Sequence, residues 1–326
     1  MSEQRTRQEW YADYIDYRAA YGYKTGSYNF IISFLNWCSK NYPDDPYLRQ
    51  EMLDRWRAKR PTENEESNAN RASSLNKFLR FIHDRSEERY TLHEGRRYPS
   101  RREPSLIDHD HALNFFRAVD ELPVSVWRCG TIQKSQVYLR ALELPVLFRL
   151  MYSSGIRPNE ARLLDRKDID LEKGIIYLRH TKGYNERIIA LHPSMTDLLK
   201  QYDKLIREAM PDVIPLFPNA KGSYPSPFWI CINFKQLWYK YNPKPENGEK
   251  DVVSYAFRHN YAIQNIMNWH QDGYNADKRL VALSRSMGHV SIQATQYYFH
   301  LVPRFADMLE DIEGDFVNNI IPEVEP

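Results

Sequence analysis

The chain has 326 residues, 42% of them hydrophobic, and a formal net charge of only +2 at pH 7. This length predicts two domains of ordinary size with a sizeable core. No run of about 18 apolar residues occurs, which argues against a membrane span, and the N-terminus MSEQRTRQEW lacks the apolar core of a signal peptide. We therefore expect a cytoplasmic protein without membrane partners, and three widely spaced cysteines fit that compartment.

The charge is distributed unevenly. No lysine or arginine follows Arg304, whereas the remaining tail, residues 304–326, is rich in Asp and Glu. The negative charge of the tail offsets the positive charge of the rest of the chain in the net value. The rest of the chain is therefore more basic than the net charge indicates, and it is suited to salt-sensitive binding of phosphates. A mixed-charge solvated surface explains the same composition equally well, so charge alone does not identify a partner.

Residues 1–92 are predicted to form a small all-helical domain. One helix has an apolar face in which five residues recur at helical spacing: Phe30, Ile31, Phe34, Leu35 and Cys38. A second helix fits residues 48–56, and a third fits residues 69–85. Arg71 and Lys77 are expected on the polar face of the third helix, where they are candidate DNA contacts, although such a face also simply keeps a domain soluble.

Residues 93–104 are rich in arginine, contain glycine and prolines, and show no periodicity, so we interpret them as an interdomain linker. Four arginines there are candidate counter-charges for a DNA backbone: Arg96, Arg97, Arg101 and Arg102. An exposed hinge is the alternative interpretation.

The second domain is predicted to span residues 105–303. It begins with helices at 108–122 and 137–152, followed by the turn Ser153-Ser154-Gly155. Pro158 favours the first position of the next helix, which places Arg157 and Glu160 at that helix's N-terminal end.

A β-hairpin is predicted from residues 175–179 and 187–191, with Lys182 in its turn. Helices follow at 193–209, 228–241 and 252–267, and the last of these contains Arg258. The protein is thus expected to be mainly α with a small β-sheet.

The candidate residues of the second domain are of the types that a metal-free transfer of a phosphodiester to a tyrosine requires. Arginine forks suit the charge of the transition state, a lysine can protonate the leaving 5′ oxygen, and a histidine can hold a phosphate oxygen. A tyrosine can form the covalent intermediate. The candidates are Arg157, Arg258, Lys182, His289 and Tyr298. Each alone is more often a structural residue, so their order and local context carry the hypothesis.

Four stretches that contain these candidates resemble motifs of the tyrosine recombinases, also called phage-type integrases. SSGIRPNEARLL is similar to the first arginine box, which implies that Arg157 is catalytic and that Glu160 is its acidic partner. HTKGYNERIIAL resembles the family's hairpin with Lys182, and AFRHNYA resembles the second arginine box with Arg258.

MGHVSIQATQYYFH is the most similar stretch. It places the family's histidine at His289 and the nucleophile at Tyr298. The resemblance covers about residues 105–300 and implies a mixed α/β tyrosine-recombinase catalytic domain. It implies that the helical N-terminal domain is the core-DNA-binding domain.

The chain departs from the family pattern in three places. Tyr255 stands where the second box normally has a histidine, which predicts a slower or differently tuned site. His259 is not expected to substitute, because the residue after Arg258 points about 100° away on a helix. Residues 268–278 resemble an insertion, and Tyr297 beside Tyr298 leaves open a switched nucleophile.

The resemblance implies strand transfer through a 3′-phosphotyrosyl link, with no cofactor, metal or ATP. It implies double-stranded DNA with a specific core site as partner, a dimer on each site and a tetramer in synapsis. We expect the acidic helix at 305–312 to dock on a neighbouring protomer. Two alternatives stay open: a type IB topoisomerase with similar residues, and a DNA-binding regulator whose catalytic site has decayed.

Overall fold

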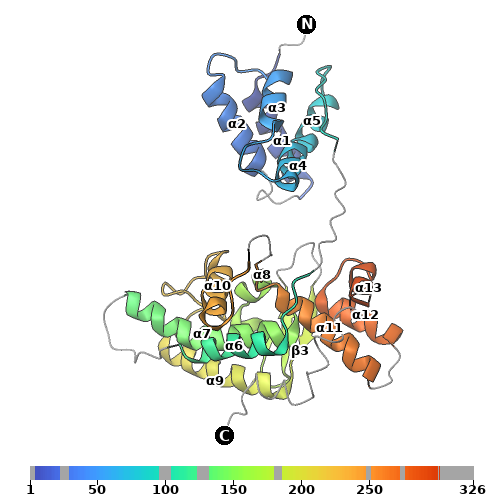
Figure 1. Ribbon diagram of the computed structural model, residues 1–326. Helices are drawn as coiled ribbons and strands as arrows, with labels where there is room; N and C mark the ends of the chain where they lie inside the picture. The colour runs from blue at the N-terminus through green and yellow to red at the C-terminus, as the bar shows by residue number, and fades with distance from the viewer. Residues whose placement is uncertain are drawn as a thin grey trace. The chain divides into compact units, whose positions relative to one another are not determined.

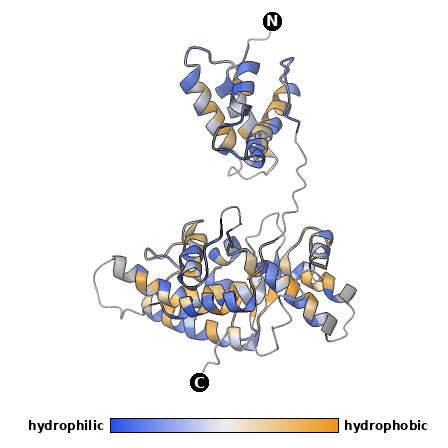
Figure 2. Ribbon diagram, in the orientation of Figure 1, coloured by the Kyte–Doolittle hydropathy of each residue, from blue (hydrophilic) through white to orange (hydrophobic). Residues whose placement is uncertain are grey.

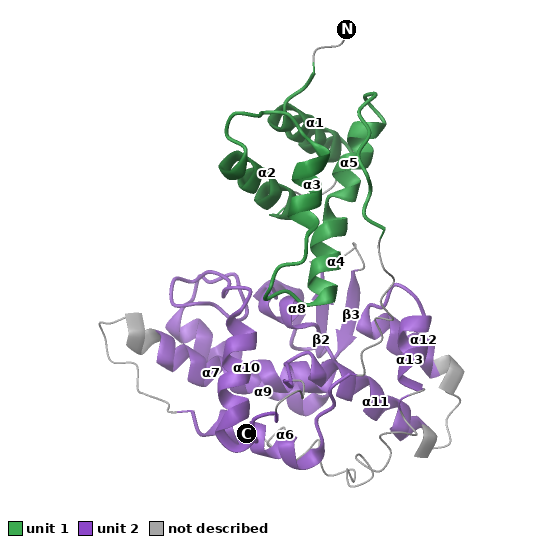
Figure 3. Ribbon diagram, turned by 45° about the horizontal axis from the view of Figure 1, so that its top comes forward, with its two compact units in different colours: residues 1–102 green, residues 103–326 purple. Residues whose placement is uncertain are grey.

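The computed structural model describes residues 4–22, 29–94, 104–122, 132–179, 186–246, 251–271, 276–299 and 301 (Figure 1). The chain divides into two compact units, residues 1–102 and 103–326, which are described separately (Figure 3). The division falls within the segment predicted as a linker. Helices dominate both units and the second contains a small sheet, so the expected fold class is confirmed.

The described part of the first unit contains these helices: α1 (Arg7–Ala20), α2 (Asn29–Asn41), α3 (Gln50–Arg57), α4 (Glu65–Ser74) and α5 (Asn76–His83). A capping box starts α1: the Thr6 hydroxyl accepts a hydrogen bond from the Glu9 amide, and the Thr6 amide donates to the Glu9 carboxylate at 2.7 Å. The Asn64 side chain caps α4 by accepting a hydrogen bond from the Ser67 amide at 2.8 Å.

Apolar side chains of the first-unit helices meet in one core around Trp10, Phe34 and Phe78. The hydrophobic stretches of these helices are orange in Figure 2. The expected apolar face of α2 is confirmed from Ile31 onward, but Phe30 is 47% exposed. The prediction of a single helix over residues 69–85 is wrong, because the helix is interrupted between α4 and α5. The hydroxyls of two serines just before the break bond to backbone carbonyls three residues earlier, which competes with regular helical bonding.

The second unit is built around the helix α7 (Ile132–Ser154). The other helical elements are α6 (His109–Asp120), α8 (Pro158–Arg162), the 3-10 turn η2 (Arg166–Asp168), α9 (Pro193–Ala209), α10 (Trp229–Tyr241), α11 (Ala256–Gln271), α12 (Ala276–Met287) and α13 (Gln293–Phe299). None of the described helices combines the length and apolar character that crossing a membrane requires.

The sheet has the order β1 (Ile169–Asp170), β2 (Ile175–Leu178), β3 (Arg187–Ala190), with antiparallel pairs throughout. The predicted hairpin is confirmed as β2 and β3, in which Ile176 pairs with Ile189 and both side chains are buried. The two-residue strand β1 was not predicted, because so short a segment has no detectable period.

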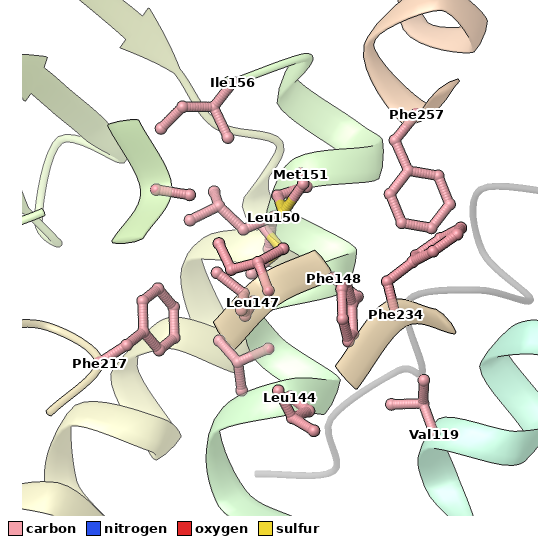
Figure 4. Close-up of a cluster of buried hydrophobic side chains, with 14 of the residues drawn as sticks. Val119, Leu144, Leu147, Phe148, Leu150, Met151, Ile156, Phe217, Phe234 and Phe257 are labelled. Carbon is pink, nitrogen blue, oxygen red and sulfur yellow. The ribbon is translucent and has the colours of Figure 1, made fainter. Parts of the chain in front are cut away.

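The main core of the second unit surrounds α7. Its residues Leu147, Phe148 and Met151 pack among aromatic side chains that include Phe234 and Phe257 (Figure 4). Burying each such side chain contributes about 1.5–3 kcal/mol. Because Phe257 directly precedes Arg258, and α7 leads into the turn before Arg157, this core fixes the positions of both arginines.

A separate apolar cluster joins α11, α12 and α13, which lie side by side in both views (Figures 1 and 3). Ile263, Ile266 and Leu283 are buried there together with Tyr298. The helix expected to end at residue 267 continues to Gln271, and α12 begins at Ala276, within the segment that resembles an insertion. This cluster sets α13 against α11.

Candidate active site

Arg157 occupies the N-cap of α8, ahead of Pro158, as the sequence predicted. Its guanidinium donates to Glu160 Oε1 at 2.8 Å and to the carbonyl of Gly288 at 2.7 Å. The turn before it depends on Gly155, whose φ is +62°. A Cβ there would lie 2.4 Å from the Tyr261 ring, so only glycine fits. Arg157 therefore links the start of α8 to the loop after α12.

Arg258, in the first turn of α11, is only 1% exposed. Its guanidinium donates to the Gly155 carbonyl at 2.7 Å and to the Met287 carbonyl, while its buried Nε has no hydrogen-bond partner among the described residues. Burial, and then the charge of Arg157, lowers the pKa of Arg258 to about 10, so the side chain stays charged at neutral pH. A buried cation with an unused donor is suited to an anionic ligand.

Arg187, the first residue of β3, joins this group although the sequence did not single it out. Its two terminal nitrogens donate to the Glu160 carboxylate at 2.9 and 2.7 Å, and its Nε donates to the Ser286 carbonyl at 2.6 Å. Burial by itself would raise the pKa of Glu160, but the hydrogen bonds and charges of Arg187 and Arg157 lower it below its ordinary value. Two guanidiniums thus contact one carboxylate, which leaves one positive charge in excess, and the neighbouring Arg258 adds a second.

His289 directly follows the end of α12 and Gly288, whose backbone carbonyls these arginines contact. Its Nδ1 is 2.6 Å from Thr295 Oγ1, and its ring is stacked on Tyr298 at a centroid distance of 6.2 Å. Burial, followed by the charges of Arg258 and other arginines, lowers the pKa of His289 to about 4. The imidazole is therefore neutral at pH 7 and can hold a phosphate oxygen through an N–H.

Tyr298, on α13, is only 4% exposed, and burial raises the pKa of its phenol to about 12. Its hydroxyl lies 2.9 Å from Nδ1 of His259. The expectation that His259 points away from the site is therefore wrong. Tyr298, the nucleophile candidate, lies on α13, which packs against α11. Its hydroxyl therefore meets the face of α11 that carries His259 and not the face that carries Arg258.

Tyr255 precedes α11 and is 37% exposed. Its ring approaches that of His259 edge-on, with centroids 5.1 Å apart. Tyr255, His259 and Tyr298 thus form a row of aromatic rings beside the arginines. The ring of Tyr297 lies 5.9 Å from that of Tyr298, on the same helix.

A cleft of about 750 Å³ opens at this site. It is lined by residues from β3, α12 and the following loop: Glu186, Arg187, Ile188, Ala282, Arg285, Ser286, Gly288, His289 and Val290. The walls carry two arginines and the candidate histidine. The cleft is thus suited to an anionic chain that approaches the buried guanidiniums.

The remaining predicted residues have different outcomes. Lys182, Arg96, Arg97, Arg101 and Arg102 lie outside the described residues. Lys77 is exposed on α5, as expected.

The expectation that Arg71 faces solvent is wrong, because it is 3% exposed. Its guanidinium donates to the Glu63 carboxylate at 2.8 and 2.6 Å and to the backbone carbonyl of Trp56. This pairing ties α4 to the loop before it and leaves no donor face for DNA. Helical periodicity could not reveal the partner, which lies in that loop.

Comparisons with known proteins identify the family of this chain. Residues 128–304, more than half of the chain, match the model of the phage integrase family. The chain belongs to that family. The tyrosine recombinase resemblance expected from the sequence is thereby confirmed.

Relatives of this phage integrase family member include two from Sinorhizobium fredii. "Putative integrase/recombinase y4rB" is 26% identical over 88% of this chain and 90% of the relative. "Putative integrase/recombinase y4rE" is 28% identical over 55% of this chain and 57% of the relative. "Tyrosine recombinase XerA" of Saccharolobus solfataricus is 26% identical over 53% of this chain and 48% of the relative. The matched region thus spans about half the length of several curated relatives.

Solved structures share the fold. The Tn1549 transposon integrase, in complex with circular intermediate DNA, has a TM-score of 0.60 at 17% identity, covering 90% of this chain and 94% of that one. A lambda integrase dimer bound to a COC′ core site has a TM-score of 0.57 at 16% identity, covering 91% and 77%. At such identities the similarity establishes the common fold and not the activity.

Proposed function

We propose that this protein is a site-specific DNA recombinase that cuts and rejoins DNA through a 3′-phosphotyrosyl intermediate, without a metal ion or ATP. The observation that supports this most strongly is the cluster of Arg157, Arg187 and Arg258 beside the buried phenol of Tyr298. Fixed cations stabilise the charge of a phosphoryl transition state, and in a dry site they do so more strongly than in water.

In this mechanism Arg157 and Arg258 hold the scissile phosphate. One of the donors is the Nε of Arg258, which has no hydrogen-bond partner within the described part of the chain. Tyr298 attacks phosphorus, the bond to the 5′ oxygen breaks, and Lys182 gives that oxygen a proton. His289 assists at the phosphate. The ester retains the bond energy, so a 5′ hydroxyl from a partner DNA reverses the step.

Two further residues support this arrangement. Glu160 orients Arg157 and Arg187 through four hydrogen bonds, one of them from the Arg157 amide. Tyr255, which is partly exposed beside His259, donates its hydroxyl to a phosphate oxygen.

The partner is double-stranded DNA with a specific core site, gripped by both units. Lys77 and the linker arginines Arg96, Arg97, Arg101 and Arg102 neutralise the DNA backbone in this proposal. The protein acts in the cytoplasm as a dimer on one site and as a tetramer in synapsis. The tail helix expected at 305–312 docks on the neighbouring protomer.

A trapping assay tests the proposal. The full-length protein is mixed with nicked duplexes from the DNA that flanks its gene, with EDTA present, and adducts that resist SDS are counted. We expect adducts with EDTA and transfer to a second duplex with a free 5′ hydroxyl. Binding without any adduct would contradict the proposal. Relaxation of a supercoiled plasmid without a target site, and no transfer, would favour the topoisomerase instead.

A further inference from the structure

His259 contacts the atom that must react. Its Nδ1 lies 2.9 Å from the hydroxyl oxygen of Tyr298, and the two ring centroids are 5.8 Å apart. The residues come from different helices, α11 and α13, which the apolar cluster around Ile263 and Leu283 holds together. The contact is therefore set by packing and does not depend on a flexible loop.

The chemistry of the two groups decides which one donates. Burial, and then the charge of Arg258, lowers the pKa of His259 to about 4, so its imidazole is neutral at pH 7. A phenol is a stronger acid than a neutral imidazole N–H, so the hydroxyl donates and Nδ1 accepts. Since burial also raises the pKa of Tyr298, the phenol stays protonated until a base takes its proton.

Neighbouring groups are less well placed for that task. The Nδ1 of His289 lies 2.6 Å from the Thr295 hydroxyl, and its ring is stacked nearly parallel to that of Tyr298, at an interplanar angle of 12°. Tyr255 lies against His259 and carries a phenol, which is a poor proton acceptor near neutral pH. The geometry therefore favours His259.

We propose that His259 is the general base of strand cleavage. Its Nδ1 takes the phenolic proton as the Tyr298 oxygen bonds to phosphorus and the bond between phosphorus and the 5′ oxygen breaks. His259 becomes an imidazolium, and the 5′ oxygen receives a separate proton from Lys182, so the step balances. Rejoining returns both protons. The inference rests on the proposed function and deepens it, because it supplies the proton acceptor that Tyr255 does not.

Two substitutions separate proton transfer from positioning. In His259→Asn the side-chain oxygen can accept the Tyr298 hydrogen bond but cannot take up its proton, whereas His259→Phe does neither. Single-turnover adduct formation is measured on nicked duplexes, with gel-shift binding and thermal melting as folding controls. We expect His259→Asn to form adducts about 100- to 10,000-fold more slowly with unchanged DNA binding.

The pH profile provides a readout that a structural role would not move. Without a base, attack needs a phenol that is already ionised, so the rate of His259→Asn should rise about tenfold per pH unit between pH 7 and about 9. The unsubstituted protein should show a much flatter profile over that range. A parallel pair of profiles would overturn the inference.

A duplex with sulfur in place of the bridging 5′ oxygen shows whether His259 takes the proton of Tyr298 or protonates the leaving group. Its leaving thiolate needs no protonation, so Lys182→Ala should recover on this substrate while His259→Asn stays slow. Recovery of His259→Asn would place its role at the leaving group and refute the proposal, as would an Asn variant within about threefold of the original rate. Failure of the unsubstituted protein on both substrates would instead refute the recombinase function itself.

Discussion

Arg187 and Glu160 form a two-pronged ion pair between β3 and α8, with oxygen–nitrogen distances of 2.9 and 2.7 Å. The two side chains are 7% and 5% exposed. Because Arg187 also donates to the Ser286 carbonyl, this one side chain connects the sheet, α8 and the end of α12. These are the elements that carry or adjoin the candidate catalytic residues.

Arg187→Ala should therefore lower the stability of the second unit. The change leaves Glu160 with only Arg157 and opens a buried space, and breaking such a pair costs about 3–5 kcal/mol. Urea unfolding followed by circular dichroism measures the difference. Lys173→Ala is the control, because the pair of Lys173 with Asp170 has a lysine that is 70% exposed, and its loss should change stability by about 0.5 kcal/mol or less. Equal effects would contradict this account.

Gly288→Ala should impair the site for two reasons. The backbone there has a φ of +63°, and a Cβ would lie 2.8 Å from Arg187 Nη1. Gly22→Ala is a matched control, since its φ is +72° but nothing lies within 4 Å of the added carbon. Both variants carry the backbone penalty of about 1–2 kcal/mol.

Only Gly288→Ala should also displace Arg187. We expect it to reduce adduct formation by about tenfold or more, which corresponds to about 1.4 kcal/mol in the barrier. Gly22→Ala should leave the rate of adduct formation unchanged. A Gly288→Ala protein as active as the control would show that Arg187 does not need its observed position.

Arg258→Lys keeps the charge but should still slow cleavage. The donors of a lysine share one nitrogen, so they do not reproduce the separate nitrogens with which Arg258 reaches the Gly155 and Met287 carbonyls and presents Nε to a phosphate. We expect a loss of about 100-fold or more in the adduct assay, in keeping with the removal of a preorganised donor. Full activity of this variant would mean that only the net charge matters at this position.

Stability should fall as the solution becomes acidic. The pKa of His259 and of His289 is lowered from 6.5 to about 4, chiefly by burial and then by Arg258. Between these values the unfolded chain binds more protons than the folded one, so this stability is fully present above pH 6.5 and is lost as the pH falls toward 4.

With allowance for solvent screening, we expect about 1 kcal/mol from each histidine. His289→Asn removes one contribution and should flatten the dependence of the urea midpoint on pH between 7 and 4.5. If the slope of the urea midpoint against pH is unchanged, the His289 imidazole has the same pKa in the folded and the unfolded protein.

The sequence predicted most of the residues that the structure brings together. Arg157, Glu160 and Arg258 lie in short motifs whose local structure, a helix start or a first helical turn, determines where each side chain emerges. His289 and Tyr298 lie in one continuous motif, so their spacing along the chain was enough to pair them. The structure adds the contacts between these motifs, such as the hydrogen bond from Arg157 to the Gly288 carbonyl.

Arg187 and His259 could not be predicted in the same way, because their roles depend on tertiary packing. Arg187 meets Glu160 only when β3 lies beside α8, and its position at a strand end resembles that of any exposed arginine. His259 was judged by its angle from Arg258 on one helix, whereas its partner comes from α13. The prediction for Arg71 failed for a related reason, since a loop residue, Glu63, pairs with it.

The most direct test of this account is to identify the residue that becomes linked to DNA. Adducts on nicked duplexes would be digested, and the modified peptide mapped by mass spectrometry, for the unsubstituted protein, Tyr297→Phe and Tyr298→Phe. We expect a 3′-phosphotyrosyl link at Tyr298, retained in Tyr297→Phe and abolished in Tyr298→Phe. A link at Tyr297, or an adduct that survives Tyr298→Phe, would contradict it.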